Sequence, residues 1–383
     1  MYKPILKWNN KSKIKNKIII ITFLVFIFGL SLVNVITEDR EISESENRPL
    51  QQLPSFSFER LISGKYTQQF DQYMMDQFVL KDAWVGLKSD VERLFFQKKE
   101  NNGVYFAEDY LLEMFTEAGP YYEKNLEAIN AFHEKMPNIL ATAILVPTAV
   151  KIYEEKLPLF APVYDQNEML EVAQNELTID FVNAYTVLNQ HKNEYIYYKT
   201  DHHWTTLGAY YVYQQLMSDW DMTPYLNYNV ETVSTEFYGT YYSKANNYHL
   251  SPDEIDVYYP QDETAFTVTW DDQTEALEGL YNEDYLSKKD KYSMFINGNH
   301  PLTIIKSSVK NGKKLIIFKD SYAHNFVPFL AMNFEEIHLI DLRYFNLNPY
   351  DYIREQEIER VLFLYNLSSF GSDSTINKLK VLN

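Results

Sequence analysis

The chain of 383 residues contains no cysteine. Disulfide bonds, zinc sites built from thiolates and a cysteine nucleophile are therefore excluded, and the redox state of its compartment leaves no mark on the sequence. The glycine fingerprints of nucleotide-binding sites are also missing, because no two glycines lie two residues apart and no Walker pattern occurs. The chemistry that stays open is that of serine, aspartate, glutamate and histidine side chains.

Basic residues are scarce, with 35 lysines and arginines against 53 aspartates and glutamates and a net charge of -18. A surface of this charge repels phosphate backbones, so we expect no nucleic-acid partner. Hydrophobic residues make up 46% of the chain, which is enough for one large globular domain with additions.

One long apolar run, "IIIITFLVFIFGLSLVNVI" at residues 18–36, has no charge and is long enough to cross a bilayer as a helix. Lysines at positions 3, 7, 11, 13, 15 and 17 precede it, and the acidic stretch "TEDREISESE" follows it. The positive-inside rule then predicts a cytoplasmic basic tail over 1–17, a single-pass signal anchor in the cell membrane over 18–36, and an extracellular remainder. The alternative is a cleaved signal peptide, whose apolar run is usually shorter and which ends at an Ala-x-Ala-like site.

The segment 37–100 is predicted to be a tether followed by a helical support. Residues 37–55 are polar and contain two prolines, and apolar residues then recur every three or four positions, with breaks near Gly64 and Val79. From residue 101 to 383, strands alternate with helices, which predicts a parallel sheet covered on both faces. An acidic, tyrosine-rich stretch over about 222–290 interrupts this alternation with short runs such as "EIDVYY" and "AFTVTW", and we interpret it as a β-rich insertion. The predicted strands are 104–106, 139–147, 177–183, 313–320, 335–342 and 360–366, with helices over about 120–135, 205–217, from about 321, and 349–357.

Ser321 stands at the end of the predicted strand "KKLIIFKD" and at the start of a predicted helix. Unpaired backbone N–H groups at a helix start stabilise an anion, so a serine there could attack an acyl group while its own amide binds the oxyanion. The alternative is that Ser321 only caps the helix.

The stretch "TDHHWT" at residues 200–205 contains a carboxylate and two histidines. On a loop, Asp201 can orient the imidazole of His203, two residues further on, whereas His202 has more difficulty reaching the same carboxylate and cleft. A metal site is the alternative, but adjacent histidines rarely share an ion and no His-Glu-x-x-His helix occurs, so we expect none. His324, three residues after Ser321, is a rival base, although such a residue is more often a surface histidine.

Taken together, "TDHHWT" and the strand-Asp-Ser-Tyr-helix pattern about a hundred residues later resemble the DHHW family. That family is related to the alginate O-acetyltransferase (AlgX/AlgJ-like) branch of the SGNH hydrolases. The segments "ENRPLQQLPSF", "YTQQFDQYMMDQF", "NGVYF", "FYGTYYSKA" and "LIDLRYF" look like further landmarks, so the resemblance covers most of the chain from about residue 45.

The resemblance implies a three-layer α/β/α domain with a parallel sheet. Because Asp201 and His203 precede Ser321, the order of the blocks is circularly permuted relative to ordinary SGNH proteins. The "FKDS" sequence replaces Gly-Asp-Ser, which leaves the local turn in question. The implied site residues are Ser321, His203 and Asp201 as catalytic residues, Asn366 as an oxyanion donor, and Arg343, Tyr322 and Trp204 near the substrate. For Trp204 and Asn366 the alternatives are a packing role and a turn role.

The activity implied by the resemblance is transfer of an acetyl group, through an ester on Ser321, to a hydroxyl of a cell-surface or secreted polysaccharide. A multi-pass membrane acyltransferase would supply the acetyl group, and no cofactor is expected. If water takes the acetyl group, the same site is an esterase. A non-catalytic polysaccharide-binding or assembly protein with this fold is the alternative from another class.

Overall fold

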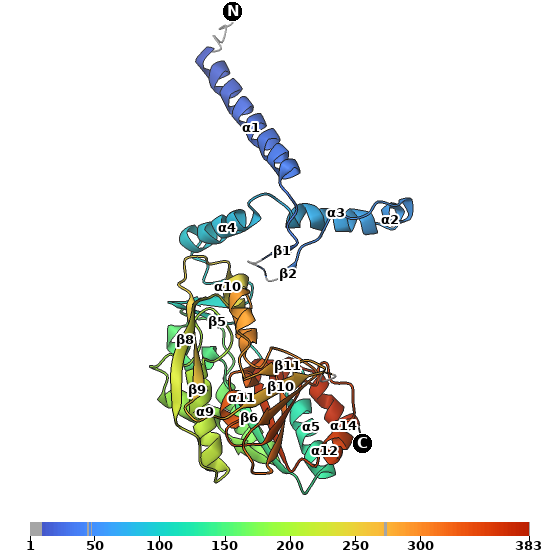
Figure 1. The fold of residues 1–383 in the computed structure, drawn as a ribbon. Coiled ribbons are helices and arrows are strands. Elements are labelled where there is room, and N and C mark those ends of the chain that lie inside the picture. The colour runs from blue at the N-terminus through green and yellow to red at the C-terminus, as the bar shows by residue number, and fades with distance from the viewer. Residues whose placement is uncertain (1–9, 44–45, 47, 272–273, 383) are drawn as a thin grey trace, which may run out of the picture. The chain divides into compact units, whose positions relative to one another are not determined.

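The protein is described by a computed structural model over residues 10–43, 46, 48–271 and 274–382. The chain divides into two units, Met1–Phe95 and Phe96–Asn383 (Figure 1). This division falls a few residues ahead of residue 101, where we expect the catalytic domain to begin.

The first unit begins with a long helix, α1 (Asn10–Ile36), which contains the predicted apolar run. The part from Lys13 to Ile36 is long and apolar enough to cross a membrane, and none of its most apolar window is buried. Three shorter helices follow, and the breaks between them lie at Gly64 and at residues 77–80, close to the predicted positions. The other elements of this unit are β1 (Ile42–Ser43), β2 (Arg48–Pro49), α2 (Phe58–Ile62), α3 (Lys65–Asp76) and α4 (Lys81–Phe95).

An eight-stranded sheet forms the centre of the second unit, in the order β11-β10-β12-β14-β13-β15-β6-β7. The five strands from β14 to β7 run parallel, which confirms the predicted parallel sheet, and β12, β10 and β11 add an antiparallel edge. The central strands read as continuous apolar runs because both of their faces are covered. Their bounds are β6 (Leu140–Val146), β7 (Asp180–Val182), β10 (Phe266–Trp270), β11 (Ala276–Glu278), β12 (Leu302–Ser307), β13 (Lys314–Lys319), β14 (Glu336–Ile340) and β15 (Arg360–Asn366).

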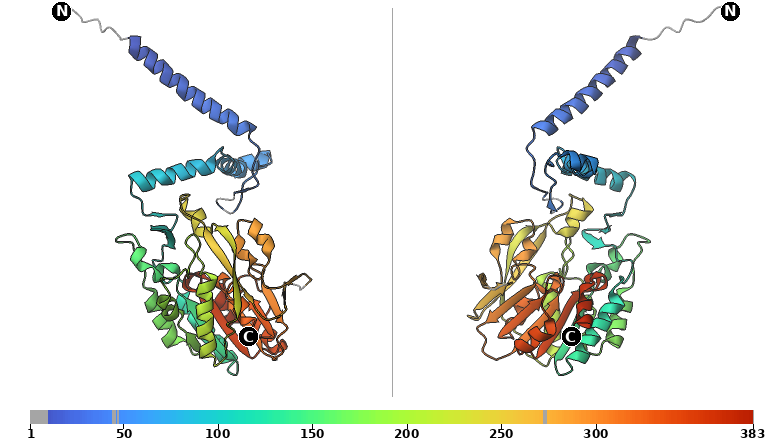
Figure 2. Two further views of the ribbon diagram at one scale, coloured as in Figure 1. Left: turned by 60° about the vertical axis from the view of Figure 1, so that its left-hand side comes forward. Right: turned by 90° about the vertical axis from the view of Figure 1, so that its right-hand side faces the viewer.

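Helices cover both faces of this sheet, as Figure 2 shows. On one face, Phe132 of α5 (Tyr122–Lys135) packs edge-on against Phe318 and Phe363 of the central strands. On the other face, Trp220, at the end of α9 (Thr206–Asp219), donates a hydrogen bond to Thr142 of β6. The remaining helices are α6 (Ala149–Ile152), α7 (Gln166–Glu176), α8 (Ala184–Gln190), α10 (Thr240–Ala245), α11 (Val327–Leu330), α12 (Pro349–Glu355), α13 (Leu367–Ser372) and α14 (Lys378–Val381).

The stretch 222–290 is rich in strands but is only partly separate from the sheet. The strands β8 (Tyr228–Phe237) and β9 (Asp253–Pro260) pair with each other as a two-stranded ribbon, whereas β10 and β11 extend the main sheet. A third small sheet consists of β3 (Glu100–Asn101), β4 (Val104–Ala107) and β5 (Tyr110–Glu113).

The prediction of a helix from about Ser321 was wrong in its starting residue. Only one 3-10 turn, Ser321–Ala323, follows the strand, and a short helix, α11, begins at Val327. The side chains of this segment bond elsewhere: Asp320 accepts from the Tyr322 amide, and Asn325 bonds to Trp204. Such side-chain bonds compete with continued helix, so a helix dipole cannot be the main source of anion stabilisation at Ser321.

Candidate catalytic site

One half of the predicted site lies at the carboxyl ends of the parallel strands. Ser321 follows β13 after Asp320, Asn366 ends β15, and Asp341 follows β14. Parallel α/β sheets present functional side chains at this edge, because the strands all end on the same side. The sheet therefore supplies the serine half of the site.

The histidine half comes from a tight loop over residues 197–204. An isolated bridge joins Tyr197 and Trp204, and the amide of Tyr198 donates to the carbonyl of His203 at 3.2 Å. The fully buried Trp204 ring donates from Nε1 to the Tyr322 carbonyl at 3.0 Å and to Asn325 Oδ1 at 2.7 Å. Trp204 thus has the packing role left open by the sequence, and it ties the histidine loop to the segment that carries Ser321.

Asp201, His203 and Ser321 form a continuous hydrogen-bonded relay. Asp201 Oδ1 lies 2.5 Å from His203 Nδ1, and His203 Nε2 lies 2.7 Å from Ser321 Oγ. The second oxygen of Asp201 accepts from the amide and the hydroxyl of Thr240, each at 2.8 Å. A carboxylate that is held in this way fixes the imidazole tautomer whose Nε2 accepts the serine proton.

Gly239 allows the loop after β8 to approach the carboxylate of Asp201. A Cβ atom at position 239 would lie 2.2 Å from the Asp201 Cβ atom and 2.3 Å from Oδ2. Any side chain there would push Asp201 or Thr240 away, so we infer that the glycine is required for the hydrogen bonds that anchor the relay.

Burial, more than the local charges, leaves His203 in the neutral form that a general base needs. Burial, together with the neighbouring His202, lowers the pKa of His203 to about 4. Burial alone would raise the pKa of the Asp201 carboxyl, but the two imidazoles beside it outweigh this effect and hold the pKa well below its usual value. Burial opposes a charge on His202 as well, but the nearby Asp201 carboxylate raises the pKa of His202 overall.

The imidazole of His203 is held between two other rings. Tyr292 stacks on it with the ring centroids 3.8 Å apart and the planes 13° apart, and His202 lies at the same centroid distance with the planes at 38°. Two rings cannot share one face at this distance, so they cover opposite faces. The Tyr292 hydroxyl also donates to the Ser321 carbonyl at 3.1 Å. The sequence offered no signal for Tyr292, which belongs to the stretch between β11 and β12.

A cavity of about 200 Å³ lies beside these residues. Its lining comes from several elements that are far apart in the sequence, and it includes His202 and Tyr322 from the two halves of the site. The Tyr322 hydroxyl donates to the His202 carbonyl, which holds this wall in place. The other lining residues are Glu113, Thr148, Thr240, Tyr241, Lys244, Asn366, Ser368 and Ser369. Three of them lie in the landmark "FYGTYYSKA" and Asn366 was predicted, whereas no sequence motif indicates the remaining four.

Two predicted residues are engaged with carboxylates. Asn366 Nδ2 donates to Asp320 Oδ2 at 2.7 Å and to Ser369 Oγ at 2.8 Å, so an oxyanion role would require it to give up one of these bonds. Arg343 forms a two-pronged pair with Asp341, at 2.8 and 2.6 Å. The backbone N–H of Ser321, in contrast, has no acceptor among the residues that the structure describes.

His324 is not the surface residue that its position suggested, because only 1% of it is exposed. Its Nε2 lies 2.8 Å from the Nζ atom of Lys319, which is buried and also contacts Asn299 at 3.1 Å. Burial, and then the Lys319 charge, hold the pKa of His324 well below its usual value. Lys319 occupies the position of the glycine in Gly-Asp-Ser, and its buried side chain bonds to His324 and Asn299.

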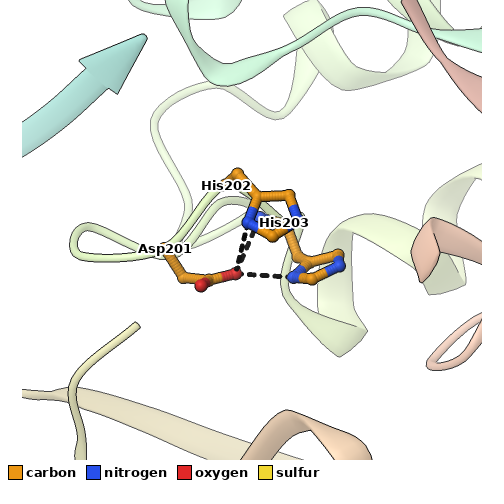
Figure 3. A group of neighbouring side chains, drawn as sticks. All are labelled: Asp201, His202 and His203. Atoms are coloured by element: carbon orange, nitrogen blue, oxygen red, sulfur yellow. Dashed lines mark hydrogen bonds and ion pairs between the residues drawn. The ribbon is translucent and has the colours of Figure 1, made fainter. Parts of the chain in front are cut away.

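The cluster of Asp201, His202 and His203 also brings together three groups that can bind metals (Figure 3). Their ligand atoms lie within 4.8 Å of one another. The 2.5 Å between Asp201 Oδ1 and His203 Nδ1 is a hydrogen-bond distance, shorter than the separation of about 3 Å or more between two ligands of one zinc ion. The geometry therefore favours a proton relay over an ion.

Comparison with known proteins adds the family context. The family model described as "DHHW protein" matches residues 167–340. Among solved structures, a DHHW family protein from Eubacterium siraeum is 29% identical, with a TM-score of 0.65, and the match covers 74% of this chain and 96% of that one. Bacillus cereus PatB1, solved with a sulfonyl adduct, is 23% identical with a TM-score of 0.61, covering 72% and 98% of the two chains.

The O-acetyltransferase domain of Pseudomonas putida AlgJ is a weaker likeness, at 13% identity and a TM-score of 0.47, with 73% of this chain and 99% of that one covered. The comparison with curated proteins gives no match. The region matched by the family model contains Asp201, His203 and Ser321, and the resemblance to the DHHW family that the motif predicted is thereby confirmed.

Proposed function

We propose that this protein is a membrane-anchored, extracellular serine O-acetyltransferase that modifies a cell-surface or secreted polysaccharide. The observation that carries the proposal is the relay from Asp201 through His203 to Ser321, with contacts of 2.5 and 2.7 Å. A neutral, oriented imidazole beside a serine hydroxyl is the arrangement that activates serine for acyl transfer. The DHHW-family resemblance is consistent with this chemistry.

In the first half of the reaction, His203 Nε2 takes the proton of Ser321 while Oγ attacks the carbonyl carbon of an acetyl donor. The Ser321 N–H donates to the oxyanion that forms. The Asp201 carboxylate stabilises the imidazolium, which then returns its proton to the leaving group as the carbonyl forms again. The products are an acetyl ester on Ser321 and the protonated leaving group.

In the second half, a sugar hydroxyl attacks the ester carbonyl while His203 removes the proton of that hydroxyl. The proton then passes to Ser321 Oγ, and the acetylated sugar leaves. The cavity beside His202, with the hydroxyls of Tyr241 and Ser368 and the amine of Lys244 in its lining, is suited to hydroxyl-rich ligands. Water in place of the sugar would make the same site an esterase.

The exported acetyl donor requires a partner, and we assign this role to a multi-pass membrane acyltransferase, as the resemblance implies. The apolar helix α1 would keep the catalytic unit at the same membrane, with the basic amino-terminal tail in the cytoplasm. The length and hydropathy of α1 support its role as a helix that crosses the membrane once.

The test is to trap acetyl-Ser321. The purified full chain is incubated with an activated aryl acetate, quenched in acid, and examined by peptide mass spectrometry, with Ser321→Ala as the control. We expect one added acetyl group on the peptide containing Ser321 and a loss of turnover in the variant. If Ser321→Ala turns over the ester as fast as the native chain, the mechanism is wrong. If a chelator abolishes turnover, the result favours a metal site instead. Adding oligosaccharide acceptors then separates transfer from hydrolysis.

A further inference from the structure

Helix α4 turns its apolar side outward. Its large apolar side chains are exposed, with Leu87 at 55%, Leu94 at 69% and Phe95 at 78%. The residues of α4 that are buried are Gly86 and Ser89. An amphipathic helix of a water-soluble protein has the opposite arrangement, with the apolar stripe in the interior.

The exposed residues form one continuous stripe. Trp84, Leu87, Val91, Leu94 and Phe95 follow one another at spacings of three and four residues or directly, so they lie on one face of the helix. At 100° per residue, Gly86 and Ser89 fall on the opposite side. In the part of the chain that the structure describes, the apolar stripe of α4 is thus exposed along its length, from 37% at Val91 to 78% at Phe95.

Other apolar residues of the first unit are exposed as well. They flank α4 and continue through the preceding helices, so the exposed apolar surface is spread over the segment that follows α1. Examples are Phe56, Phe58, Ile62, Met75 and Leu80 in the first unit, together with Phe96, the first residue of the second unit. Apolar surface of this extent on a protein marks a site of interaction with another protein or with lipid.

We propose that α4 lies in the interfacial layer of the bilayer that α1 spans. This inference rests on the proposed function, since it requires α1 to remain as the anchor. The reason to choose lipid is that α4 belongs to the same unit as the apolar helix α1, which ends at Ile36, whereas α4 begins at Lys81. A tryptophan and a phenylalanine on the stripe, with Lys88 at its edge, match the aromatic and snorkelling residues found at membrane interfaces.

The arrangement has a consequence for the reaction. The catalytic unit begins at Phe96, directly after α4 ends at Phe95. If α4 lies on the membrane, the chain enters the catalytic unit at the bilayer surface, where an integral membrane donor would deliver the acetyl group.

The absence of cysteine makes a direct test simple, because a single cysteine can be introduced and spin-labelled without a background. The full chain is reconstituted in lipid nanodiscs with a label at Leu87→Cys or Val91→Cys. Phe26→Cys in α1 is the lipid control, and Gln174→Cys on the exposed side of α7 is the water control. The measurement is the accessibility of each nitroxide to oxygen, which enters the bilayer, and to a water-soluble nickel chelate, which does not.

We expect the α4 labels to be more accessible to oxygen than to nickel, as at Phe26→Cys, and opposite to Gln174→Cys. A label shielded from both reagents overturns the inference, because it means that protein covers the stripe. A water-like result at α4 overturns it as well. If Phe26→Cys itself is water-like, the anchor fails and this inference fails with it, whereas turnover of an aryl acetate reports on the catalytic part of the proposal separately.

Discussion

Two buried imidazoles stand near Ser321, and their partners are of opposite charge. His203, in the loop 197–204, contacts the carboxylate of Asp201 and the hydroxyl of Ser321. His324, in the segment after β13, contacts the amine of Lys319. Tyr292 stacks with both rings, at 3.8 Å from His203 and 6.1 Å from His324. The two histidines therefore share a neighbour and a degree of burial but differ in the group behind them.

The difference decides which imidazole can act as a base. Burial keeps both rings neutral by lowering the pKa of each. The lone pair of His203 Nε2 faces the serine hydroxyl, and Asp201 can stabilise the charge that follows proton transfer. An ammonium can only donate, so a protonated Lys319 occupies the lone pair of His324. Burial also lowers the pKa of Lys319 to about 8, although Asp341 opposes this.

The largest predicted effect comes from replacing His203 and His324, one at a time, by alanine. His203→Ala should lower kcat for an aryl acetate by about 10³-fold or more, because it removes the base from a unit that acts together. His324→Ala should change kcat by less than about tenfold per folded molecule but lower the free energy of unfolding by about 1–3 kcal/mol, since it removes one of the two acceptors of the buried Lys319 ammonium. Turnover assays and urea unfolding measure the two quantities.

His324→Gln is the matched control, because its amide oxygen can accept from Lys319 and should restore part of the stability. The comparison breaks if His324→Ala loses activity as completely as His203→Ala while remaining folded. In that case the two imidazoles act as one relay, and the distinction drawn from their partners is wrong.

The sequence alone predicts the relay because its three residues lie in two short motifs. Asp201 and His203 are separated by one residue on a loop, and Ser321 ends a strongly apolar strand, so local pattern and family resemblance together point to them. The parallel strands were predictable for the same reason, since buried strands are continuous apolar runs. Features that depend on residues close together in the sequence, such as these motifs and apolar strands, could therefore be predicted from the sequence.

Tyr292, Lys319 and Gly239 could not be assigned in this way. Each of these residues contacts another that the fold brings to it. Tyr292 stacks on His203, and Gly239 lies against Asp201. Lys319 bonds to His324 across a turn. The helix expected at Ser321 failed because its side chains bond across the loop to Trp204 and Asn366. Contacts of this kind become visible only when the fold has placed both partners.

A smaller effect is expected at Tyr292, which we interpret as a positioning residue for His203. Tyr292→Ala should lower kcat by about 10 to 100-fold with little change in KM, because an imidazole without its stacking partner is less well aligned with Ser321. Tyr292→Phe keeps the ring and loses the bond to the Ser321 carbonyl, so kcat should stay within about fivefold, the equivalent of one net hydrogen bond of about 1 kcal/mol. Equal losses in both variants would contradict a role for the ring face.

The smallest effect concerns His202 and appears in the pH profile. The charge on His202 helps to lower the pKa of His203 to about 4, so kcat/KM of the native chain should fall only as the pH drops through about 4, where His203 gains a proton. His202→Phe keeps a ring against His203 but removes the charge, which raises the pKa of His203 and moves this acid limb to higher pH. His202→Gln removes both ring and charge. If the charge on His202 lowers the pKa of His203, both variants should shift the acid limb to higher pH by a similar amount. If the limb stays in place in His202→Phe and moves only in His202→Gln, the effect comes from ring packing and not from charge.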